Sequence, residues 1–244
     1  MTPTSVAQLI ETTTAATKAC PGWAGSDAHL DVLEQYLKDR ASSITEVRWH
    51  QHESFWDRKS GIVFLERPGG GVSLLEDVSR CALNAFHESL HARYSTDPKV
   101  TAFFVELDNL DNAGNETGAL LRGIFNQLED ERVMRAEAQT ATDDLGEMND
   151  FRDKIFEDHF EDYRNRHAEE LWTANPADPI DQFTVTLTVL IHGSTLHELH
   201  PRVRTLLNDC EPVIDHAVQG MMMEAVASTY DIVQLYQAAL PDLV

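Results

Sequence analysis

Residues 87–91 read His-Glu-Ser-Leu-His, an HExxH pentad, and they form the most chemically specific pattern in the chain. In a helix, His87 and His91 lie one turn apart on one face, so both imidazoles can reach a single zinc ion. Glu88 lies about 100° around that helix, where it can reach a water beside the metal without ligating the metal. The pentad therefore predicts Zn²⁺ held by His87 and His91, with Glu88 as the catalytic general base of a hydrolase, most readily a peptidase.

The neighbouring sequence predicts a helix that can position this pentad. Ser73 and Glu76 fit an S-x-x-E capping box just after the break at 68–71, so we expect a helix from about Ser73 to Tyr94. A polar stripe that contains Asn84 and both histidines runs beside a broad apolar face, formed by Leu75, Val78, Ala82, Ala85, Phe86 and Leu90. This layout favours a buried helix with one functional edge. The competing interpretation is a pair of solvated or core histidines without a metal.

A catalytic zinc ion needs a third protein ligand, and the next predicted helix, 117–138, offers one. Glu129 lies at the edge of its apolar stripe, where a charge is costly unless it meets a metal or a cation. The helical wheel places Asp130 on the far side, so Glu129 is the favoured ligand. Arg132 lies within the stripe, and together with Asp130 and Asn84 it is a candidate to hold the ligands in place. Alternatively, this is a charged surface helix whose side chains pair with their neighbours.

A peptidase of this kind also uses a histidine or tyrosine to stabilise the oxyanion. The candidates are Tyr94, Tyr163, His192 and His197, and the sequence does not choose among them. A second metal site at His192, His197 and His200 matches no known ligand spacing, so surface or core histidines are the favoured interpretation there.

Two motifs in this order resemble a known family. Residues 87–95 are similar to HExxH-x-RY-[ST], and residues 126–133 are similar to N-x-LED-x-R-[IV], the pair found in the cobaltochelatase CobT subunit and in shorter CobT-like proteins of phages and actinobacteria. The resemblance covers about 60–135. It implies a gluzincin-like metallopeptidase core with His87, His91 and Glu129 as ligands and Glu88 as the base.

This chain departs from the family pattern at two points. Met134 stands where the family usually has an acid, and the chain contains no DxSxS motif of the kind carried by the von Willebrand A domain of CobT subunits. The resemblance therefore implies a peptidase-like module more than a chelatase subunit.

The remaining sequence predicts an α+β fold that is mostly α. We expect one zincin-like domain over 1–244, built from N-terminal helices (1–43), a small sheet and the metal-site helices (44–138), and a helical part (139–244). The expected helices lie at about 5–19, 28–40, 143–172, 180–196, 201–218 and 221–240, and the expected strands at 44–51 and 61–66. By analogy with zincins, the small sheet would pair with an extended substrate.

Composition excludes several function classes. The net charge is −22, from 41 acidic residues against 19 Lys plus Arg, so the chain should repel nucleic acid and anionic membranes. This charge suits a peptide or protein substrate of basic character; DNA mimicry shares the charge, but charge alone is weak support for it. No CxxC, signal peptide or membrane-spanning run is visible, so we expect a cytoplasmic protein with reduced cysteines.

Two functions remain in competition. The preferred one is a zinc-dependent, gluzincin-like metallopeptidase. The alternative is a non-catalytic metal-binding interaction or assembly module related to the CobT subunit, and a third option is a related fold that holds no metal.

Overall fold

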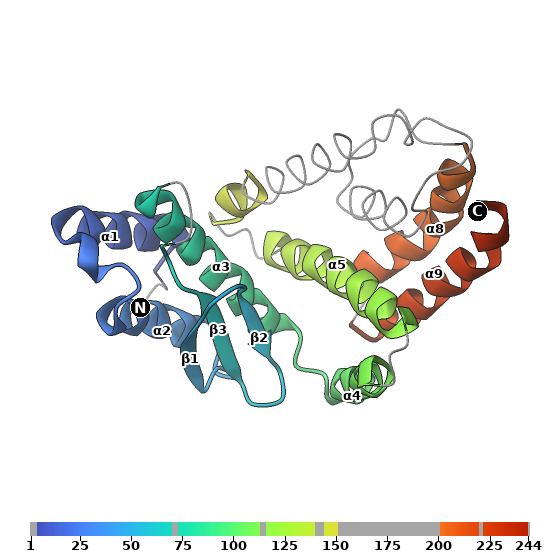
Figure 1. The fold of residues 1–244 in the computed structure, drawn as a ribbon, viewed down its shortest axis with the longest axis horizontal. Coiled ribbons are helices and arrows are strands. Elements are labelled where there is room, and N and C mark those ends of the chain that lie inside the picture. The colour runs from blue at the N-terminus through green and yellow to red at the C-terminus, as the bar shows by residue number, and fades with distance from the viewer. Residues whose placement is uncertain are drawn as a thin grey trace. The chain divides into compact units, whose positions relative to one another are not determined.

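The computed structural model of the protein describes residues 4–69, 73–112, 116–139, 144–150, 201–219 and 222–243. These residues are mostly helical and include one three-stranded sheet, which confirms the expected α+β class (Figure 1). The chain divides into two compact units: unit 1 comprises Met1–Thr96 with Ala136–Phe151, and unit 2 comprises Asp97–Arg135 with Arg152–Val244. The single zincin-like domain stays a prediction, and the helices expected at 143–172 and 180–196 lie wholly or mostly outside the described residues.

Unit 1 begins with two capped helices, close to where the sequence predicts them. Helix α1 (Val6–Ala19) starts at Ser5, whose hydroxyl accepts a hydrogen bond from the backbone N–H of Gln8 while the Gln8 side chain accepts from Ser5 N–H. This reciprocal pair satisfies two backbone donors that the helix leaves open. After a short 3₁₀ turn, η1 (Pro21–Trp23), helix α2 (Asp27–Arg40) follows.

The sheet of unit 1 has the strand order β1-β3-β2. Strand β1 (Glu46–His50) is parallel to β3 (Ile62–Glu66), and β2 (Phe55–Asp57) is antiparallel to β3. The sequence predicts β1 and β3 but not the three-residue β2. Gly61 leads into β3 with a φ of +72°, and a Cβ there would lie 2.6 Å from the Ser43 carbonyl oxygen, so glycine is required on both counts.

Helix α3 (Leu74–Tyr94) carries the pentad and packs against α1, α2, β2 and β3 (Figure 1). Most of its predicted apolar face is buried, with Phe86 and Leu90 fully inaccessible. The predicted capping box is wrong: Ser73 is the N-cap residue, but its side chain makes no cap hydrogen bond. The Asp77 carboxylate instead accepts a hydrogen bond from Gly69 N–H at 3.1 Å, which ties the incoming chain to the first turn.

Unit 2 is helical in its described part. Helices α4 (Pro98–Asn112), α5 (Glu116–Gln139), α8 (Pro201–Gln219) and α9 (Met222–Leu243) share one apolar core, in which the rings of Phe103 and Phe125 are tilted against each other with centroids 5.0 Å apart. The sequence predicts α5, α8 and α9 but not α4. None of the helices that the structure describes combines the length and hydropathy needed to cross a bilayer.

A buried charge cluster holds unit 1 together; we use this name for the buried residues Arg40, Glu137 and Asp144 with their partners Tyr94, which is half-buried, and Arg93, which is 42% exposed. The Arg40 guanidinium lies 3.0 Å from Asp144 Oδ2 and 3.3 Å from Glu137 Oε1, and all three side chains are at most 7% exposed. Asp144 also accepts a hydrogen bond from the first backbone N–H of α1 at 2.7 Å, where the helix dipole favours an anion. The cluster therefore joins the end of α5 and the segment after it to the N-terminal helices.

His29 is a second buried polar group of unit 1. Its Nδ1 accepts a hydrogen bond from Gly25 N–H at 3.1 Å, and its ring stacks on Trp23 with centroids 4.5 Å apart. Accepting this bond requires Nδ1 to be unprotonated. Burial lowers the pKa of His29 from 6.5 to about 4, so the folded protein keeps this ring neutral.

Stability should therefore fall as pH falls from about 6.5 toward about 4. In that window the unfolded chain protonates His29 and the folded protein does not, which favours unfolding by on the order of 1 kcal/mol after solvent screening. Urea unfolding at pH 7.0 and pH 4.5 measures this loss. His29→Gln keeps a hydrogen-bond acceptor without titrating, so it should show a smaller loss; an equal loss in both proteins would contradict the assignment.

Candidate metal centre

The Nε2 atoms of the two pentad histidines on α3 lie close together. Their Nε2 atoms lie 3.0 Å apart, and their rings meet edge to face with centroids separated by 4.6 Å. Tetrahedral zinc with Zn–N bonds of about 2.05 Å places two nitrogens about 3.3 Å apart, close to the observed separation. Without a metal, the same two atoms can share one proton. The pair therefore fits either a bound cation or an imidazole–imidazole hydrogen bond.

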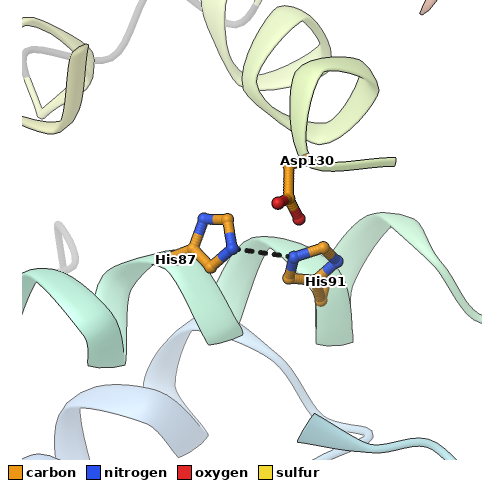
Figure 2. A group of neighbouring side chains, drawn as sticks. All are labelled: His87, His91 and Asp130. Carbon is orange, nitrogen blue, oxygen red and sulfur yellow. Dashed lines mark hydrogen bonds between the residues drawn. The ribbon is translucent and has the colours of Figure 1, made fainter. Parts of the chain in front are cut away.

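A carboxylate completes a three-residue group with these histidines. One ligand atom each from His87, His91 and Asp130 lies within 4.8 Å of the others, so the group could hold a metal ion (Figure 2). Two nitrogens and one carboxylate oxygen are a donor set that zinc accepts in proteins, and they leave a fourth position for water or substrate. Among the described residues, no other group of three such side chains meets the same test.

The three-residue group includes Asp130, whereas the helical wheel favours Glu129 as the third ligand. The wheel took one apolar stripe as the packed side of α5. In the structure, residues 128–134 are buried almost all round, and Asp130 is the only half-buried position among them. A helix buried on every side has no polar face from which the direction of one carboxylate can be inferred.

Glu129 is 1% exposed and lies near a cation. Its Oε1 is 3.8 Å from Nη2 of Arg132, one turn later on α5, and Arg132 is also buried. This proximity agrees with the sequence expectation that Arg132 neutralises a carboxylate. Glu129 is not a member of the three-residue group, and its role as a metal ligand stays a prediction.

Helix α3 carries two further polar side chains near the pentad histidines in the sequence, those of Glu88 and Asn84. Glu88 is 6% exposed and follows His87 directly on the helix. The Asn84 side-chain amide donates to Ser54 Oγ at 3.2 Å, and Ser54 Oγ accepts from Glu66 N–H at 2.9 Å. Asn84 therefore links α3 to the sheet, which holds the metal-binding face of the helix in place.

Of the four oxyanion candidates, only Tyr94 lies in the described part of the chain. Its hydroxyl donates a hydrogen bond to Glu137 Oε2 at 2.8 Å, within the buried charge cluster. Tyr163, His192 and His197 lie outside the described residues. Sequence reasoning did not single out Glu137, which belongs to neither of the two motifs.

The chain matches no protein-family model, no curated protein and no solved structure. The resemblance to the CobT subunit therefore rests on the two motifs alone. Function has to be argued from the geometry and chemistry of the site itself.

Proposed function

We propose that the protein is a zinc-dependent hydrolase of the gluzincin-like kind that acts on peptide bonds. The convergence of the His87 and His91 Nε2 atoms, 3.0 Å apart, carries this proposal. The carboxylate of Asp130 supports it by supplying an oxygen donor to the same group. A net charge of −22 further supports a basic peptide or protein as substrate.

His87, His91 and Asp130 would hold the zinc ion. When bound, zinc supplies Lewis acidity, which makes water acidic near neutral pH and polarises a carbonyl group. Glu88 accepts the proton of the attacking water and delivers it to the leaving amine nitrogen, so one carboxylate serves first as base and then as acid. The rigid helix fixes Glu88 relative to both imidazoles, and the Asn84–Ser54 hydrogen bond fixes the helix relative to the sheet.

One observation favours the alternative of a non-catalytic metal-binding assembly module. Within the described residues, the single oxyanion candidate, Tyr94, is already hydrogen-bonded to Glu137. A site that binds zinc but lacks a group to stabilise the oxyanion would turn over slowly. The two functions share their ligands and differ in whether Glu88 has a role.

Glu88→Gln should keep zinc and lose hydrolysis. We expect one zinc per chain in both proteins and a fall in kcat of at least about 10²-fold, because glutamine cannot accept the proton. Zinc content by elemental analysis and cleavage of a mixed peptide library by mass spectrometry measure the two effects.

Glu76→Gln, on the exposed first turn of α3, is the matched control and should behave as wild type. Undiminished cleavage by Glu88→Gln would sink the proposed role of this residue. Zinc binding without any cleavage by wild type would instead support the assembly module.

A further inference from the structure

Helix α1 carries one face that the described residues of unit 1 leave mostly exposed. Its opposite face is buried, and the helix contacts α3. The exposed face borders a groove of about 410 Å³, whose lining also includes Glu147 from the segment after α5. We use the name α1 face for the helix residues that line this groove: Ala7, Ile10, Glu11, Thr14, Ala15 and Lys18. All of them lie in unit 1; Ile10 and Thr14 are half-buried, and the other four are exposed.

The α1 face combines small side chains with two opposite charges. Thr14 and Ala15 lie at its middle, so a second helix can approach closely there. Glu11 lies three residues before Thr14, and Lys18 lies four residues after it. Because Glu11 and Lys18 are seven residues apart, almost two helical turns, they lie on nearly the same edge of the helix. The two charges therefore flank the middle of the face symmetrically.

We propose that the α1 face is the interface of a homodimer, in which α1 of one copy packs antiparallel against α1 of a second copy. A twofold axis near Thr14 places Lys18 of each copy opposite Glu11 of the other, because the same patch is used twice. Both ion pairs form together for the same reason. A parallel pair would set lysine against lysine and glutamate against glutamate, which charge repulsion disfavours.

Charge favours a second copy over an unrelated basic partner. The groove is lined by two acids, Glu11 and Glu147, and by one cation, Lys18. A basic helix would pair with the acids but would also meet Lys18, whereas a second copy brings a lysine to Glu11 and a glutamate to Lys18. The net charge of −22 opposes association at long range, but about 0.15 M salt screens exposed charges beyond about 8 Å. The contacts within the interface are shorter than this.

The interface is small, so the dimer should be weak. A pair of single helix faces buries less than the about 1,600 Å² of a standard interface, and we expect a dissociation constant of about 10 to 100 µM. Sedimentation equilibrium of the full chain at loading concentrations of about 5 to 500 µM, in about 0.15 M NaCl, covers this range.

Opposite charge reversals test the antiparallel pairing and do not depend on zinc. Glu11→Lys and Lys18→Glu should each weaken self-association by at least about tenfold, because each change replaces two ion pairs by two repulsions. An equimolar mixture of the two variants should dimerise as wild type does, since each variant then meets the opposite charges on the other. Recovery in the mixture also shows that both variants are folded.

Glu34→Lys and Lys38→Glu on α2 are the matched controls. These residues form a partly exposed ion pair one turn apart, so the changes alter the net charge equally but lie outside the α1 face. Both controls should dimerise as wild type does. Three results would overturn the inference: a wild type that stays monomeric at about 500 µM, controls that weaken association as much as the α1 variants, or a mixture no more dimeric than its separate components.

Discussion

Replacing Arg40 with methionine should lower the free energy of unfolding of unit 1 by about 3–5 kcal/mol, the cost of breaking a buried ion pair on one side. The guanidinium is 7% exposed, contacts both Glu137 and Asp144, and lies 4.7 Å above the centre of the Phe86 ring. Methionine keeps most of the apolar packing but removes the guanidinium from the buried carboxylates of Glu137 and Asp144, and the remaining cation, Arg93, contacts Glu137 and is itself 42% exposed. The loss should therefore come from charge and not from volume.

Urea unfolding followed by tryptophan fluorescence measures this effect. Arg48→Met is the matched control, because Arg48 also pairs with a carboxylate, Glu46, but both side chains are about half exposed. An exposed pair contributes little, so the control should unfold close to wild type. A similar small shift in both variants would show that the buried charge cluster does not stabilise unit 1.

His91→Ala should abolish stoichiometric zinc binding, with a loss of affinity of at least about 100-fold. The variant removes one of two nitrogens that meet at 3.0 Å, and one imidazole with one carboxylate cannot hold zinc at micromolar concentration. Elemental analysis after dialysis against metal-free buffer gives the zinc content. His50→Ala, on strand β1, should retain zinc because His50 is outside the three-residue group.

The same assay separates the two candidate carboxylates. Asp130→Asn should weaken zinc binding more than Glu129→Gln, because Asp130 belongs to the group with the histidines and Glu129 lies close to Arg132. The opposite order would favour the ligand set implied by the CobT resemblance. Zinc retained by His91→Ala would contradict the metal centre as a whole.

Local signals in the sequence account for most of the described fold. Apolar periodicity and the breaks between periodic segments predict α1, α2, α3 and α5 to within a few residues, because both signals are local in the sequence. Strand β2 escaped prediction because three residues cannot show alternation, and it exists through its pairing with β3. Helix α4 escaped because charged residues interrupt its apolar pattern, while Val100, Phe103 and Leu107 still reach the core.

The candidate site, like the fold, could be predicted from the sequence only where the signal is local. The histidine pair was predictable because a four-residue spacing on one helix fixes both rings locally. The choice between Glu129 and Asp130 was not, because it depends on the rotation of α5 about its own axis.

The buried charge cluster joins residues that are far apart in the sequence, and this separation bears on the order of folding. His87 and His91 are brought together by one helical turn, which forms within microseconds. The Tyr94–Glu137 bond closes a loop of 43 residues, and the Arg40–Asp144 pair spans 104, so both carry a larger entropic cost and need native topology. A folding chain would therefore bring the two imidazoles together first, and zinc that arrives early would meet only two of the three protein ligands that we propose.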